Sequence, residues 1–389
     1  MINWSMKLTG GVCAAAMSFA TSTAGAADTA GADSLKAEIA RTRSIAYTIT
    51  YVNWALQYTE EGKECPQGFN DGPREHFKML FPDDGKKRGY VDTATAREIA
   101  GWYPDQFKEP FPFKLAGGPI APGMNLDGKT DADDFTNADG EKGVDNQFYR
   151  GIGCIESYRG KDAFNNFWDI RQLLEGTHNR MLFEITDLDS LENDPDVTVT
   201  MSRGLHLLLR DAAGTTIGFK GIPGGTQKVD TRWGRKYIQK YKGRIENGVL
   251  ITEPGTYVFP WQTFNSPTEL KVYAMRTQLK LTPEFAEGLL GGYLDFTSFH
   301  RRKLRSESLH HQSYGRNPSA LLYQNLQQIA DGPIDPVTGK RSSVSSALVT
   351  RWAQVFVIRP ENETPVAEAP RTPSKVAVLT SVSNASATK

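Results

Sequence analysis

Residues 236–251 read KYIQKYKGRIENGVLI. Asn247 and Gly248 stand between two strand-forming runs, and this dipeptide is the strongest short signal for a β-hairpin. Further strand-like runs lie on both sides of it, at residues 181–186, 196–202, 205–210, 256–259, 269–281 and 352–358. The sequence therefore predicts an α+β, β-rich protein whose C-terminal half is an antiparallel sandwich or a barrel-like sheet.

The other segments predict one more strand region and several helices. Residues 44–59 are rich in β-branched and aromatic residues and favour strands. Helices are expected at residues 34–42, 73–81, 93–103, 163–180, 282–293 and 319–331.

These elements divide the chain into five parts. We expect a signal peptide (1–26), a mixed α/β region (27–122), an acidic loop (123–160), a helix followed by an antiparallel β-rich domain (161–360), and a disordered tail (361–389).

The first residues predict export. A short basic start is followed by the apolar run 8–20 and by Ala24-Gly25-Ala26, a cleavage motif of small residues. The run is shorter than the roughly 20 residues that a membrane span needs. We expect cleavage after Ala26 or Ala27 and a periplasmic or secreted mature chain without a membrane span.

Cleavage would remove Cys13 and leave Cys65 and Cys154. Two cysteines in an oxidising compartment predict a disulfide, with two buried free thiols as the alternative. The spacing excludes CxxC redox chemistry and haem attachment. The formal net charge of +0 gives no sign of nucleic-acid binding.

The most unusual stretch is residues 123–147, GMNLDGKTDADDFTNADGEKGVDNQ, with seven acidic residues and two lysines. Its first eight residues match the phosphate-loop pattern GxxxxGK[ST]. A phosphate loop needs a strand before it and a helix after it, whereas Pro and Gly precede this match and aspartates follow it. We therefore expect no nucleotide.

A repeat within this stretch suggests calcium instead. Asn125-x-Asp127-Gly128 recurs twelve residues later as Asn137-x-Asp139-Gly140, and alternating side-chain oxygens before a glycine are typical of calcium loops. The expected ligands are Asn125, Asp127, Asp131, Asp133, Asn137, Asp139 and Asp145, with Asp134 a further source of oxygens. The absence of Cys and His from this set disfavours zinc. The alternative is a surface loop whose Asp and Asn residues cap turns.

The run Asp139-Gly140-x-x-Gly143-Val144-Asp145-Asn146-Gln147 resembles a loop of uncharacterised exported bacterial proteins. Those proteins also carry a β-rich segment after the loop, so the resemblance covers about the middle half of the chain. It implies no activity.

The rest of the chain carries no recognised catalytic motif. His310-His311 is the most site-like histidine pair, but adjacent side chains point apart in regular structure. His206 is expected in the core. Glu184, Asp187 and Asp189 could be paired carboxylates for glycoside hydrolysis, but positions at a strand end and in a turn explain them equally well.

Trp233, Tyr257 and Trp261 could form an aromatic binding platform, although such residues are more often core. We expect an exported, calcium-stabilised protein that binds a ligand or an envelope protein. The alternative is a periplasmic or secreted enzyme, such as a hydrolase, with scattered active-site residues.

Overall fold

The computed structural model describes residues 25–59, 62–70, 112–159, 163, 173, 180–209, 221–232, 234–263, 266–306 and 319–359. The predicted signal peptide up to residue 24, the tail and the helices expected at 73–81 and 93–103 lie outside this part. So do most of the helix expected at 163–180, Trp233 and His310-His311. No helix in the described part is both long and apolar enough to cross a membrane.

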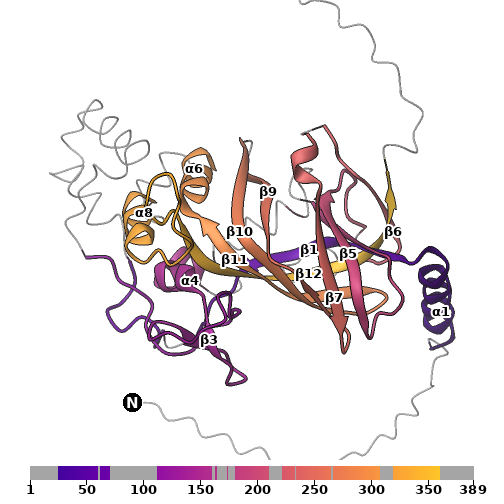
Figure 1. Cartoon of the computed structure of the whole chain (residues 1–389), viewed down its shortest axis with the longest axis horizontal. Helices are drawn as coiled ribbons and strands as arrows, with labels where there is room; N and C mark the ends of the chain where they lie inside the picture. The colour runs from indigo at the N-terminus through magenta and orange to yellow at the C-terminus, as the bar shows by residue number, and fades with distance from the viewer. Residues whose placement is uncertain are drawn as a thin grey trace, which may run out of the picture.

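Eight strands form a closed antiparallel barrel (Figure 1). They are β1 (Ser44–Trp54), β4 (Met181–Thr186), β5 (Asp194–Arg203), β7 (Gln239–Glu246), β8 (Val249–Thr252), β10 (Ser266–Leu281), β11 (Phe285–Asp295) and β12 (Ser343–Ile358). Each strand pairs with the next of the set along the chain, and β12 closes the ring on β1, where Tyr47 lies opposite Gln354. The predicted β-rich fold is confirmed, and it is a barrel rather than a sandwich.

Smaller elements extend the barrel. Strand β9 (Gly255–Thr263) forms a hairpin with β10, β6 (Gly225–Lys228) pairs in parallel with the end of β12, and β2 (Phe135–Thr136) pairs with β3 (Lys142–Val144). Helices α4 (Gln147–Ile152), α6 (Phe296–Ser306) and α8 (Ser319–Gln328) gather at one end of the barrel (Figure 1). Helix α1 (Gly25–Thr42) lies at the opposite end. The short helix η3 (Glu156–Tyr158) follows α4, and the short helix η4 (Arg235–Tyr237) precedes β7.

The hairpin that predicted the fold has the expected geometry. Asn247 and Gly248 connect β7 to β8 with φ angles of 50° and 78°. Positive φ at both central residues is the feature of the type I′ turn, whose twist matches that of the flanking strands. The predicted hairpin is therefore confirmed.

The helix predicted at residues 282–293 is wrong, because Phe285–Asp295 is β11. Ala286, Leu290 and Leu294 face the core. A spacing of four residues fits one face of a helix and also one face of a strand. Pairing with β10 on one side and β12 on the other decides for the strand.

The strand predicted at 205–210 is also wrong over the described residues 205–209. The backbone N–H of His206 donates to the side chain of Gln227, which in turn donates to the carbonyl of His206. These bonds replace a strand ladder, and His206 is partly exposed rather than a core residue.

Aromatic side chains fill the barrel. Phe183 contacts Tyr47 and Trp352, with ring centroids 5.0 Å and 4.9 Å apart, and Trp54 contacts Phe148 at the helical end. Tyr257 and Trp261 are buried in the same core. An eight-stranded barrel is just wide enough for its side chains to fill it. A void of about 10 Å³ beside Trp54 has room for about one water.

Candidate functional site

The first repeat of the acidic loop is a tight turn capped by its own side chains. Asn125 Oδ1 accepts a hydrogen bond from the N–H of Gly128, and Asn125 Nδ2 donates to the carbonyl of Lys129. Asp127 Oδ1 accepts from the N–H of Lys129, whose ammonium lies 3.2 Å from Asp127 Oδ2. Gly128 has a φ of 81°, which glycine adopts without strain.

The second repeat is built in a related way at a separate turn between β2 and β3. Asn137 Oδ1 accepts from the N–H groups of Asp139 and Glu141, and Asn137 Nδ2 donates to the Glu141 carboxylate. The repeated sequence is thus a repeated asparagine-capped turn.

Two apolar residues attach the loop to the outside of the barrel. Met124 and Leu126 are buried in a small cluster with Tyr293 of β11. A Cβ at Gly291 would lie 2.8 Å from Met124 Sδ, so glycine is needed for this close approach. Arg276 of β10 donates to the carbonyls of Leu126 (2.6 Å) and Asn125 (3.4 Å).

A bulge in β10 orients these wall residues. The pairing of β10 with β11 shifts register between Tyr273 and Arg276, and Ala274 has a φ of 47°. A bulge kinks its strand and re-aims the neighbouring side chains. Here Tyr273 and Ala274 pack on the cluster of Met124 and Leu126.

The end of the loop, around Gly143 and Asp145, packs against its beginning. Gly143 passes so close to the first turn that a Cβ there would lie 2.3 Å from the carbonyl of Lys129. Asp145 is 7% exposed, and its Oδ2 accepts a 2.6 Å hydrogen bond from the N–H of Leu126. Its own N–H donates to the carbonyl of Met124.

Asn146 and Gln147 connect the loop to the helical end of the barrel. Asn146 caps α4 by accepting from the N–H of Tyr149, and its Nδ2 donates to the carbonyls of Ala55 and Pro122. The side chain of Gln147 donates to the carbonyl of Asp133. The run from Gly143 to Gln147 therefore holds the loop in place.

Negative charge accumulates where the loop meets the barrel. The pKa of Asp145 is raised to about 6, chiefly by burial and in smaller part by the carboxylates of Asp134, Asp127 and Asp331. The pKa of Asp331 is raised as well, chiefly by burial. Arg150 of α4 donates to the backbone carbonyl of Asp133, and Arg276 donates to that of Leu126. These two cations therefore bind carbonyls of the loop and form no ion pair with its carboxylates.

The predicted calcium ligands fall into separate groups. The charges of Asp127, Asp134 and Asp331 raise the pKa of Asp145, so these four form one group. Asn137 and Asp139 belong to the second turn. Asp131 donates its N–H to the Asp134 carboxylate, and Asp133 is held through its carbonyl. Within the described residues, no three Asp, Glu, His or Cys side chains are arranged to hold a metal ion. Asp331 was missed because it is remote in sequence.

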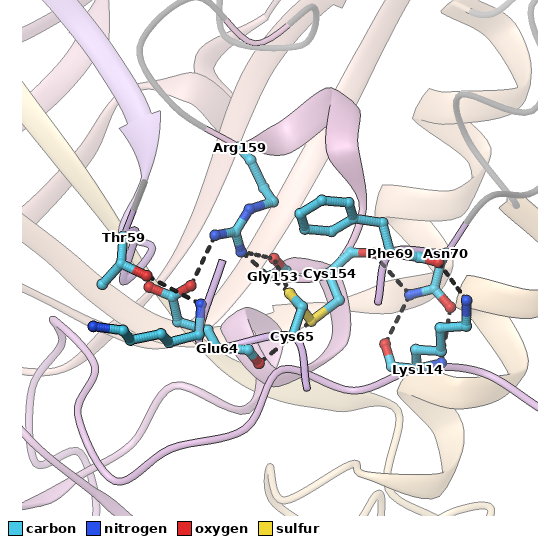
Figure 2. Close-up of a disulfide and its surroundings, with 10 residues drawn as sticks. Thr59, Glu64, Cys65, Phe69, Asn70, Lys114, Gly153, Cys154 and Arg159 are labelled. Carbon is cyan, nitrogen blue, oxygen red and sulfur yellow. Dashed lines mark hydrogen bonds and ion pairs between the residues drawn. A yellow bond between two sulfur atoms is a disulfide. The ribbon is translucent and has the colours of Figure 1, made fainter. Parts of the chain in front are cut away.

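The predicted disulfide joins Cys65 to Cys154, just after α4 (Figure 2). Beside it, Arg159 Nη2 lies 2.8 Å from the Glu64 carboxylate in a buried ion pair. Asn70 Oδ1 accepts a hydrogen bond from the N–H of Lys114, and Asn70 Nδ2 donates to the carbonyls of Lys114 and Cys154. This network fastens residues 62–70 to the end of α4.

The other sequence candidates have structural roles. Glu184 pairs with Arg359, and Asp189 pairs with Arg43 at 2.6 Å. Asp187 lies in the turn after β4 with a φ of 63°. The phosphate-loop match at residues 123–130 is not followed by a helix, as expected. Comparisons with protein-family models, curated proteins and solved structures returned no match.

Proposed function

We propose that the chain is an exported binding protein that recognises its ligand or partner on its outer surface, with calcium stabilising the acidic loop. The observation that supports surface recognition is the filled barrel, whose void beside Trp54 is about 10 Å³. Ligand sites for small molecules are typically clefts of about 300–1,000 Å³.

The outer surface offers apolar groups. Leu207 and Leu209 are 58% and 52% exposed and line a shallow groove with Ile222 over β1 and β12. The chain between Leu209 and Gly221 lies outside the described residues. Exposed apolar patches are typical of interaction surfaces.

Calcium is supported by the charge balance of the loop. Asp127, Asp134 and Asp331 each raise the pKa of Asp145, and Asp127 also raises the pKa of Asp134. Lys129 pairs with Asp127, while Arg150 and Arg276 bind carbonyls. A divalent cation would relieve this repulsion, and carboxylate and carbonyl oxygens are the ligands that calcium prefers. Binding requires some of these side chains to leave their turn hydrogen bonds.

Thermal unfolding tests the calcium part. A ligand that binds only the native state raises the melting temperature. We expect a rise with calcium that excess chelator reverses, and no comparable rise with magnesium, which demands near-octahedral geometry. Equal melting temperatures in calcium and in chelator would remove calcium from the proposal.

Surface recognition is tested with the apolar dye anilinonaphthalene sulfonate, which becomes fluorescent on exposed apolar surface. We expect native protein to enhance its fluorescence, and Leu207→Ser with Leu209→Ser to abolish the enhancement. The control is Val337→Ser, at an exposed valine in a distant turn. Undiminished fluorescence in the double variant would contradict the assignment.

Export predicts that the mature protein begins at Ala27 or Asp28.

A further inference from the structure

The two cysteines of the disulfide are both buried but not to the same extent. The Cys65 residue is 7% exposed, whereas Cys154 has no exposed surface. Thiol–disulfide exchange requires an incoming thiolate to reach one sulfur of the bridge. Of the two residues, Cys65 lies nearer to solvent and is the one that we expect an incoming thiolate to reach first.

A cation is held against the sulfur of the more exposed cysteine. Arg159 Nη1 lies 3.3 Å from Cys65 Sγ and donates to the carbonyl of Gly153 at 2.6 Å, while Nη2 faces Glu64 (Figure 2). The guanidinium also lies 5.2 Å and 5.1 Å from the ring centres of Tyr58 and Phe69. These contacts position Arg159 independently of the sulfur–sulfur bond.

The two cysteines are also held together by bonds other than the bridge. Asn70 donates both its backbone N–H and its side-chain Nδ2 to the carbonyl of Cys154, at 2.7 Å and 3.1 Å. Glu64 and Asn70 flank Cys65 on the same segment. Breaking the sulfur–sulfur bond therefore leaves both sulfurs facing each other.

We propose that Cys65 and Cys154 are a thiol–disulfide exchange pair, in which Cys65 forms the mixed disulfide with a dithiol partner and Cys154 is the thiolate that leaves. In reduction, a partner thiolate attacks Cys65 Sγ, and Cys154 leaves as a thiolate that takes up a proton. The second partner thiol then attacks the partner's own sulfur in the mixed disulfide and releases Cys65. The bridge gains two electrons and two protons, and the partner dithiol becomes a disulfide.

Arg159 sets the reactivity of Cys65 in the reduced pair. A neighbouring cation stabilises a thiolate and lowers the pKa of the thiol below its ordinary value of about 8.5. Glu64 shares the same guanidinium and opposes this effect by its negative charge. Removing the arginine should therefore slow the reaction of Cys65, and neutralising the glutamate should accelerate it.

The test uses the mature chain, which lacks Cys13, as Cys154→Ser and Cys65→Ser proteins that each keep a single thiol, and the neutral disulfide reagent dithiodipyridine at pH 7. We expect Cys65 to react at least about tenfold faster than Cys154, since thiolate fraction and access both favour it. Arg159→Gln in the Cys154→Ser protein should slow Cys65 several-fold. Arg150→Gln, the matched control, should not, because Arg150 contacts Phe135 and Asp133 instead. Equal rates, or no effect of Arg159→Gln, would overturn the proposal.

A second measurement keeps the bridge intact and so does not depend on how the cysteine variants fold. Native wild-type protein is incubated with dithiothreitol without denaturant, and its free thiols are trapped and counted. We expect reduction of the pair with retention of the folded circular-dichroism spectrum, and re-formation of the same bridge on oxidation. A bridge that persists until urea unfolds the chain would assign it a purely structural role.

Discussion

Asp145 Oδ2 accepts a hydrogen bond from the backbone N–H of Leu126, nineteen residues earlier in the chain. This bond closes the acidic loop on itself at the point where Leu126 packs on the barrel wall. The carboxylate that closes the loop is therefore also the one that lies against Asp127, Asp134 and Asp331. Asp145 therefore both closes the loop and lies where negative charge accumulates, so substitutions at Asp145 test both features.

Asp145→Asn is expected to reduce the calcium-dependent rise in melting temperature. The amide keeps an oxygen for the N–H of Leu126 but loses the charge that a cation would neutralise. Asp139→Asn is the matched control in the second turn, and it should retain most of the rise. Melting curves of both variants in calcium and in chelator measure the difference. Loss of the rise in the Asp139 variant alone would place the ion at the second turn.

Leu126→Ala should lower the free energy of unfolding by about 2–4 kcal/mol, because it removes a buried side chain and leaves a cavity against the barrel wall. Val337→Ala is the control, since Val337 is 91% exposed and should change the stability by less than about 0.5 kcal/mol. Urea denaturation of both proteins gives the comparison. Similar small effects in both would mean that the loop does not depend on its contact with β11.

Gly291→Ala tests the same contact from the side of the barrel. The added Cβ would lie 2.8 Å from Met124 Sδ and 3.4 Å from a Leu126 methyl, so the Met124 side chain must move. We expect a loss of about 1–3 kcal/mol from overpacking. At Gly117 a Cβ would meet its neighbours at ordinary distances of 3.7 Å or more, and Gly117→Ala should be nearly neutral. A neutral Gly291→Ala protein would show that the loop is only loosely attached.

The buried pair of Glu64 and Arg159 predicts acid sensitivity. Burial by itself would raise the pKa of Glu64, but the hydrogen bonds from Arg159 and neighbouring groups outweigh it, and the pKa is lowered below 4.5. A lowered native pKa contributes stability that is present above pH 4.5 and is lost as the pH falls through the native pKa. Glu64→Gln should cost about 3–5 kcal/mol at pH 7 because it leaves the buried Arg159 without an opposite charge.

The cost of Glu64→Gln should shrink as the pH falls through the lowered native pKa of Glu64, where wild type also loses the charge. Urea denaturation from pH 7 to pH 2 measures it. Glu246→Gln breaks an exposed pair with Arg244 and should have little effect throughout. A cost that stays constant with pH would mean that the ion pair does not stabilise the fold.

Much of the fold could be predicted because its signals are local. The Asn247-Gly248 turn, the strand-like runs and the asparagine-capped turns at Asn125 and Asn137 each depend on backbone preferences within a few residues. The pairing of Cys65 with Cys154 followed from the number of cysteines that the predicted signal-peptide cleavage would leave. Where one pattern fits two structures, as at Ala286, Leu290 and Leu294, local reading chose wrongly.

The sequence by itself determined a β-rich chain with a hairpin at Asn247, a capped acidic loop and a pair of cysteines. The tertiary structure alone decided that β12 pairs with β1 and so closes a barrel, that residues 285–295 form a strand inside it, and that Asp331 joins Asp145. It also decided that Arg159 lies against Cys65. The physical reason is that these contacts join segments far apart in the chain. Short-range spacing carries no information on which of many possible long-range pairings buries the most apolar surface.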